Sequence, residues 1–180
     1  MSILIDTSSL HSLVRYYLPF DKKEVLAPLF KSKIESSEIV LIDKVYLECK
    51  FVGGGVITES LPFLNNKKYH LKTDTILPDT KFFNRLDNDF TNKLKRASLS
   101  PQQFEAQKKQ FLQSADAKLI LAAYHELKKG SYKILTEESR SSNDNKAFLK
   151  IPLICDRLDI DVISLPMLFE SYEISITFRR

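Results

Sequence analysis

The sequence predicts an α/β fold with a central parallel sheet of about four strands flanked by helices. Short apolar segments rich in β-branched residues alternate along the chain with longer segments in which apolar residues recur at helical spacing. Strands that alternate with helices are typical of right-handed crossovers in a parallel sheet. The chain has 180 residues, of which 43% are hydrophobic, which suits one ordinary domain with a packed core. We therefore expect a single domain over residues 1–180.

The first strand is predicted over residues 2–5, which are apolar and end at Asp6. Small hydroxyl residues follow Asp6, a pattern that favours the start of a helix. Apolar residues at helical spacing then predict one helix over 10–18, which Pro19 closes, and a second helix over 21–36.

The second strand is predicted over residues 39–42 and ends at Asp43, which we expect to cap a helix over 44–51. Three of the four glycines in the chain follow together at positions 53–55. No Gly-Lys-Ser/Thr sequence comes after them, which excludes a phosphate-binding P-loop and indicates a flexible turn.

The middle of the chain, from about 56 to 112, is interpreted as a helical insertion within the domain. Helices are expected over 81–95 and 100–113. The second has a clear start, because Ser100 is a favourable cap, a proline follows in the first turn, and Gln103 completes a capping box.

The last third returns to alternating helices and strands. In chain order we expect a helix over 115–129 that Gly130 ends, a strand over 132–135, a polar loop over 139–146, a helix over 151–158, a parallel strand over 161–165 and an edge strand over 173–178.

The net charge of +4 and the pI of about 8.9 are only mildly basic, so the distribution of charge is more informative than the total. The basic residues that gather in the middle third are Lys67, Lys68, Lys93, Lys95, Arg96, Lys108 and Lys109. A basic surface beside an acidic site suits a phosphate-rich polymer, although solvated helix faces explain the same residues.

Cysteine and histidine spacing excludes several kinds of site. Cys49 and Cys155 form neither a Cys-x-x-Cys pair nor a disulfide framework, so we interpret them as reduced core thiols. The three histidines are scattered and match no zinc-binding spacing. No apolar run approaches the roughly 18 residues that span a bilayer, and the N-terminus lacks the pattern of a signal peptide. We expect a cytoplasmic protein with no membrane partner.

Carboxylates gather where the predicted strands end. Asp6 and Asp43 each close a strand, and Glu138 comes shortly after a third. Because parallel strands end at one edge of a sheet, these side chains are expected to face one crevice. Glu48 lies in the helix after Asp43, and Asp116 lies in the first turn of a later helix that is expected to start at the same edge.

Several carboxylates in one crevice repel one another unless a cation is present. Oxygen-only ligands favour a hard cation, Mg²⁺ or Mn²⁺. Each residue also has a simpler interpretation: Asp6 and Asp43 as helix caps, Glu48 as a solvated charge, and Asp116 as a partner of the helix dipole.

Four segments in order resemble the acidic motifs of PIN-domain ribonucleases. Ile-Leu-Ile-Asp6-Thr-Ser-Ser resembles their opening strand, and Ile-Asp-Lys-Val-Tyr-Leu-Glu48 resembles their second motif. Ala-Asp116 followed by an apolar helix is similar to the third, and Thr-Glu-Glu138 to the fourth, where the family usually has Thr-x-Asp. The later run Lys-Ile-Pro-x-x-Cys, residues 150–155, is similar to a bacterial PIN-like subfamily of undefined function.

The resemblance implies a three-layer fold and a metal-dependent endoribonuclease in which a metal-activated water hydrolyses the phosphodiester, leaving 5′-phosphate and 3′-hydroxyl ends. The carboxylates that match the family's motifs, and would hold one or two Mg²⁺ or Mn²⁺ ions, are Asp6, Glu48, Asp116 and Glu138. The residues expected to contact these ligands and fix the orientation of their carboxylates are Thr7, Ser8, Asp43, Thr136 and Glu137. Because Glu138 stands where an aspartate is usual, Glu137 is an alternative fourth ligand.

The resemblance also implies partners: an RNA substrate, an antitoxin protein that blocks the crevice, and a second copy of the chain. Arg140, Lys146 and Lys150 are candidate phosphate contacts, although they are equally well explained as solvated charges. One rival function is a catalytically silent PIN-like module that binds RNA or protein. Another is a phosphatase-like hydrolase with Asp6 as nucleophile, which is disfavoured because Ser8 stands where that class has a second aspartate.

Overall fold

A computed structural model describes residues 2–126, 132–141 and 145–174 of the chain. Its centre is a five-stranded sheet in the order β3-β2-β1-β4-β5, in which every pair of neighbours is parallel. The strands are β1 (Ser2–Ile5), β2 (Ile39–Ile42), β3 (His70–Leu71), β4 (Tyr132–Leu135) and β5 (Val162–Ile163). The predicted α/β class with a parallel sheet is confirmed, with five strands in place of about four.

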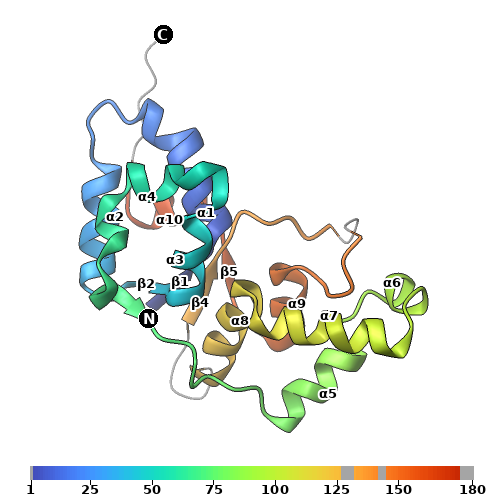
Figure 1. Cartoon of the computed structure of the whole chain (residues 1–180). Coiled ribbons are helices and arrows are strands. Elements are labelled where there is room, and N and C mark those ends of the chain that lie inside the picture. The colour runs from blue at the N-terminus through green and yellow to red at the C-terminus, as the bar shows by residue number, and fades with distance from the viewer. Residues whose placement is uncertain (1, 127–131, 142–144, 175–180) are drawn as a thin grey trace.

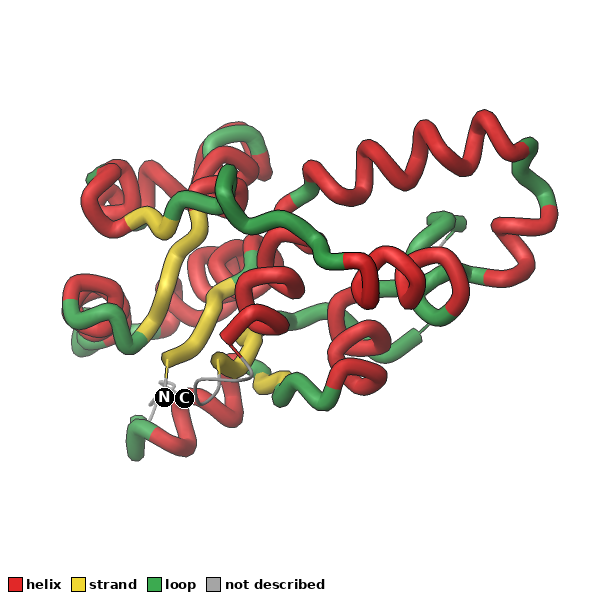
Figure 2. The backbone as a smooth tube through the Cα atoms, turned by 90° about the horizontal axis from the view of Figure 1, so that it is seen from below, coloured by secondary structure: helices red, strands yellow, loops and turns green. Residues whose placement is uncertain are grey.

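Continuous apolar sequence explains why the central strands lie inside the molecule. Ile3, Leu4 and Ile5 of β1 are all buried, although successive side chains of a strand point to opposite faces. A strand that is buried on both faces needs helices on both sides of its sheet. Figure 2 shows the strands as a row between two groups of helices.

Ten α-helices are present in the described residues. They are α1 (Thr7–Ser12), α2 (Leu26–Glu35), α3 (Asp43–Cys49), α4 (Val56–Ser60), α5 (Thr80–Asn88), α6 (Lys93–Ala97), α7 (Pro101–Gln113), α8 (Ala115–Glu126), α9 (Ile151–Leu158) and α10 (Leu165–Ser171). None of the described helices combines the length and the apolar character needed to cross a bilayer.

The helices form the two outer layers of a three-layer arrangement (Figure 1). On one side α2 packs on β2, and α10 joins it through the rings of Phe30 and Phe169, whose centroids lie 6.5 Å apart. On the other side α8 packs on β4 and β2, and α9 packs against α8. These layers are consistent with the PIN-like fold that the sequence resemblance implies.

The interpretation of residues 56–112 as a helical insertion is wrong in one respect, because this stretch also supplies an edge strand. Two residues, His70 and Leu71, pair in parallel with Leu41 and Ile42. A two-residue strand is too short to give a periodic signal in the sequence, and only pairing with β2 makes it a strand. The segment that projects away from the sheet consists of α5, α6 and α7 (Figure 1).

The helix predicted over 81–95 is wrong, because α5 ends at Asn88 and α6 begins at Lys93. Between them the Thr91 hydroxyl donates a hydrogen bond to the carbonyl of Leu86 at 2.7 Å, and Thr91 pairs with Phe148 as an isolated β-bridge. This pairing with a distant segment interrupts the helix.

The helix predicted over 21–36 begins only at Leu26. The Asp21 carboxylate accepts a hydrogen bond from the Leu26 N–H at 2.7 Å, and Glu24 has a φ of 50°, which no α-helix accommodates. The helix predicted to start among the hydroxyl residues after Asp6 and to run through 10–18 begins at Thr7. It continues as a π-helix over Leu13–Tyr17 and a 3₁₀ turn over Leu18–Phe20.

Several predictions near the C-terminus are confirmed, and others lie outside the described residues. The strand over 132–135 and the helix over 151–158 have the predicted bounds. The last strand is shorter than predicted, because Leu165 already belongs to α10. The predicted end of α8 at Gly130, the centre of the polar loop over 139–146 and most of the edge strand over 173–178 lie outside the described residues.

Candidate active site

Asp6 lies at the carboxyl end of β1, where it also begins α1, and it is 4% exposed. Its Oδ1 accepts a hydrogen bond from the Thr7 N–H at 2.7 Å, so the capping interpretation is confirmed. Its Oδ2 accepts bonds from the hydroxyls of Ser8 at 2.5 Å and Thr136 at 2.8 Å. Thr136 follows β4, so residues from the ends of two adjacent strands hold this carboxylate in one orientation.

Thr7 links Glu48 to Asp6 by hydrogen bonds to both carboxylates. The Thr7 hydroxyl donates a hydrogen bond to Glu48 Oε2 at 2.7 Å, while the Thr7 N–H donates to Asp6. Helix α3, which carries Glu48, packs against α1, which carries Thr7. The hydroxyls predicted to support the carboxylates therefore contact two of them directly.

Glu137 and Glu138 leave the end of β4 in different directions. Glu138 Oε2 accepts a hydrogen bond from the Ile151 N–H at 3.0 Å, at the start of α9. Glu137 Oε1 accepts one from the Leu165 N–H at 2.6 Å, at the start of α10. Burial raises the pKa of Glu138, and the charge of Asp6 raises it further. Glu138 thus lies in the field of Asp6, while the carboxylate of Glu137 is bonded to the start of α10.

Asp116 lies in the first turn of α8, and its pKa is affected by the other three predicted carboxylates. Burial raises the pKa of Asp116 to about 7, and the negative charges of Asp6, Glu138 and Glu48 raise it too. A nearby like charge disfavours ionisation, and burial reduces the screening by solvent. We call Asp116 and the three acids whose charges act on it the carboxylate cluster.

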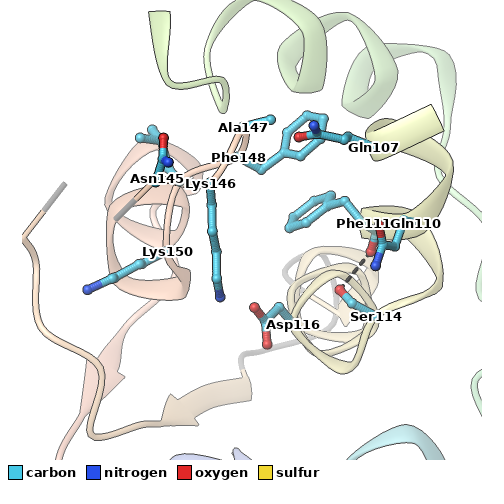
Figure 3. Close-up of a pocket in the computed structure, with 11 residues that line it drawn as sticks. Gln107, Gln110, Phe111, Ser114, Asp116, Asn145, Lys146, Ala147, Phe148 and Lys150 are labelled. Carbon is cyan, nitrogen blue, oxygen red and sulfur yellow. Dashed lines mark hydrogen bonds between the residues drawn. The ribbon is translucent and has the colours of Figure 1, made fainter. Parts of the chain in front are cut away.

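Two of the three predicted phosphate contacts lie beside this cluster. Lys146 and Lys150 line a pocket that also contains Asp116, and Figure 3 shows the Lys146 side chain directed toward the Asp116 carboxylate. The Lys146 charge lowers the pKa of Asp116, opposing the larger effects of burial and of the other acids.

Arg140 has a different partner. Its guanidinium binds both carboxylate oxygens of Asp156, with Nε–Oδ2 and Nη2–Oδ1 distances of 3.1 and 3.2 Å. This bond raises the pKa of Arg140 above its usual range. A phosphate would have to compete with Asp156 for this side chain.

The carboxylate cluster fits a hard divalent cation by its chemistry. Its donors are all oxygen, and burial together with the neighbouring acids raises the pKa of Asp116 to about 7, an effect that the charge of a bound cation would oppose. In the described part of the chain, however, no three His, Cys, Asp or Glu side chains are already arranged to hold an ion. One oxygen of Glu48 and one of Glu138 accept hydrogen bonds from the Thr7 hydroxyl and the Ile151 N–H, so protein donors hold both carboxylates.

Asp43, predicted to lie near the ligands, instead anchors the segment after β3. Its Oδ1 accepts hydrogen bonds from the Thr73 hydroxyl at 2.6 Å and from the Lys44 N–H at 2.9 Å. Sequence reasoning missed Lys118, which is 4% exposed and donates from Nζ to the carbonyls of Thr73 at 3.1 Å and Ile76 at 2.8 Å. A lysine within an apolar helical stretch was the available signal.

The two cysteines are buried, as predicted for core thiols. Burial raises the pKa of Cys49 to about 12, and the charges of Glu48 and Asp6 contribute. Burial also raises the pKa of Cys155 to about 12. Neither thiol forms a nucleophilic thiolate at neutral pH.

The chain matches a family model described as a domain of unknown function (DUF4411) over residues 3–176. It belongs to the DUF4411 family. Comparisons with curated proteins and with solved structures gave no match. Because the description of the DUF4411 family names no activity, the function has to be argued from the carboxylate cluster.

Proposed function

We propose that this DUF4411 protein is a PIN-like endoribonuclease that depends on Mg²⁺ or Mn²⁺. The observation that supports the proposal most directly is the pKa of Asp116, which burial and the charges of the other three carboxylates raise to about 7. Concentrated negative charge at the carboxyl ends of parallel strands is costly for a folded protein, and a divalent cation relieves it.

In this proposal Asp6 is the central ligand, and Glu48, Asp116 and Glu138 bind directly or through water. One or two bound ions would supply a hydrolytic nucleophile and neutralise the developing charge on the phosphate. The protein's own hydroxyls keep Asp6 in place, since Ser8 and Thr136 both donate to its Oδ2. Lys146 and Lys150 would hold the phosphates that flank the scissile bond.

The test is cleavage of a single-stranded RNA with Mn²⁺ or Mg²⁺, comparing wild type with Asp6→Asn. The variant should lose more than about 100-fold of the single-turnover rate, because an amide is a poor ligand for a hard cation. Asp43→Asn is a matched control, since Asp43 also follows a strand but binds Thr73. It should cleave as wild type does, whereas equal cleavage by Asp6→Asn would falsify the proposal.

One observation favours a second function, a silent PIN-like module that binds RNA or protein without cutting. In the described residues the carboxylates are not preset as a three-ligand site. Titration calorimetry with Mn²⁺ separates the two functions. A nuclease should bind Mn²⁺ in a manner that Asp116→Asn weakens, while a silent module should show no such binding.

The sequence resemblance extends the proposal to the biological setting. The enzyme would act in the cytoplasm as the toxin of a toxin–antitoxin pair, with an antitoxin covering the carboxylate cluster and with a second copy of the chain as partner. Expression of wild type should then slow growth, whereas Asp6→Asn should not. Equal growth of the two strains would contradict the toxin assignment.

A further inference from the structure

A pocket of about 390 Å³ opens beside Asp116, between α7 and the segment that leads into α9 (Figure 3). Its volume is within the range of small-ligand sites, roughly 300–1,000 Å³. Asp116 belongs to the carboxylate cluster and also lines the pocket, together with Lys146 and Lys150, so the pocket adjoins the cluster. A molecule bound at the cluster has this space beside it.

One wall of the pocket is aromatic. The rings of Phe111 and Phe148 are stacked, with centroids 4.6 Å apart and planes inclined by 22°. Phe104 backs Phe148 at 5.6 Å, which keeps the pair in place. Figure 3 shows both rings of the stacked pair lining the pocket above Asp116. A rigid aromatic surface of this kind suits a flat ring, because bases stack on aromatic side chains.

Amide side chains surround the same space. Gln107 and Gln110 reach it from α7, and Asn145 reaches it from the opposite wall (Figure 3). None of these three amides forms a side-chain hydrogen bond with another described residue, so their donors and acceptors are available. An amide offers both a donor and an acceptor, which matches the edge of a nucleobase.

Positive charge lies on the side of the pocket nearest to the carboxylate cluster. Lys146 is directed toward Asp116, and Lys150 lies at the start of α9 (Figure 3). Lysines bind phosphate as point charges, whereas an apolar metabolite or an aliphatic side chain would leave both unused. The aromatic wall, the amides and the lysines together match the face of a base, its edge and the phosphate beside it.

We propose that this pocket receives one unpaired nucleobase of the RNA strand, next to the phosphate at the carboxylate cluster; the inference rests on the proposed nuclease function and names its substrate as single-stranded. A paired base cannot enter, because its edge is occupied by its partner and its faces by its neighbours in the stack. Most of the pocket is built by α7 and the Asn145–Lys150 segment, so the recognition belongs to the part of the chain that projects beyond the sheet.

The proposal is tested by binding in EDTA, so that no cleavage takes place. The probes are fluorescein-labelled eight-nucleotide strands of A, U or C, and an abasic ribose–phosphate strand of equal length. Wild type should bind at least one base-bearing strand roughly tenfold more tightly than the abasic strand, which is the usual effect of one stacked and hydrogen-bonded base. Equal anisotropy curves for all four probes would overturn the proposal, because phosphates alone would then explain binding.

Surface glutamines of the same helix provide matched variants. Gln107→Ala and Gln110→Ala change pocket residues, while Gln102→Ala changes an exposed glutamine of α7 that does not line the pocket. Both pocket variants should lose most of the preference for base-bearing RNA and keep their affinity for the abasic strand, and Gln102→Ala should behave as wild type. If all three behave alike, the amides do not read a base and the proposal fails.

A parallel cleavage assay with Mn²⁺ keeps the two proposals distinguishable. Base-dependent binding that Gln107→Ala removes, without cleavage under any metal, would support the pocket and refute the nuclease. Metal-dependent cleavage with identical behaviour of Gln107→Ala and Gln102→Ala would support the nuclease and refute the pocket. Failure of every RNA probe to bind would refute the pocket and favour a side chain of a partner protein as its occupant.

Discussion

Replacing Asp116 with asparagine should stabilise the metal-free protein above neutral pH. Burial, together with the charges of Asp6, Glu138 and Glu48, raises the pKa of Asp116 to about 7. The folded protein therefore binds this proton more tightly than the unfolded chain. The protonated Asp116 therefore contributes to the free energy of unfolding. This contribution is fully present below about pH 4 and is lost as the pH rises to about 7. Asparagine has nearly the same shape and never ionises, so it avoids this loss.

The size of the effect follows from the pKa. A rise from 3.8 to about 7 corresponds to at most about 4 kcal/mol, since one pKa unit is worth about 1.4 kcal/mol. Asp116 keeps some contact with solvent, which screens the charge, so we expect about 2 kcal/mol at pH 8. In a protein of this size each kcal/mol shifts Tm by roughly 2–4 °C, which gives a rise of about 4–8 °C.

The assay is thermal unfolding in EDTA across a pH series, with wild type and Asp116→Asn side by side. The difference in Tm should be small near about pH 4 and reach its full value above about pH 7. Adding Mn²⁺ should raise the Tm of wild type more than that of the variant, because a ligand stabilises only the state that binds it. A variant that is less stable than wild type at about pH 8, or a difference that ignores pH, would refute the reasoning.

Three further substitutions test the scaffold by urea unfolding. Lys118→Met should lower the free energy of unfolding by about 1–3 kcal/mol, because two buried backbone carbonyls lose their donor. An unchanged urea midpoint would mean that the cost of burying the Lys118 ammonium cancels the gain from these two hydrogen bonds. Gly55→Ala should lower the free energy of unfolding by about 2–3 kcal/mol. Gly55 has a φ of 92°, and a Cβ there would lie 3.3 Å from the backbone oxygen of Lys50. Gly54→Ala, with a φ of 73° and open space around it, should cost only about 1 kcal/mol; equal losses would rule out the steric part of the argument.

The elements that were predicted well are those with strong local signals. The central strands β1, β2 and β4 are rich in apolar residues, and their bounds could be read directly from the sequence. The start of α7 was also correct, because Ser100 and Gln103 form the expected capping box. Two of the errors have a common cause, since β3 and the break between α5 and α6 exist through pairing with distant segments, β2 and Phe148.

The same division applies to the candidate site. Asp6 and Glu138 could be predicted, because the topology of a parallel sheet sends residues at strand ends to one edge. The same argument failed for Asp43, which binds Thr73. The sequence could not tell Glu137 from Glu138, since the two are adjacent; the hydrogen bonds to α10 and α9 separate them. It also could not show that Arg140 is engaged by Asp156. The spacing of Gln107, Gln110 and Phe111 on one face of α7 was a signal for the pocket that was not used.

By itself, the sequence determined the α/β class and the positions of the buried strands, and it suggested the set of carboxylates. These features can be read from a few consecutive residues: the apolar pattern of a strand and the acid that follows it. Only the tertiary structure decided which acid lies in the field of Asp6, where the edge strand forms, and that α7 meets the Asn145–Lys150 segment over Asp116. Those outcomes depend on contacts between segments far apart in the chain, and no local pattern encodes their distance or orientation.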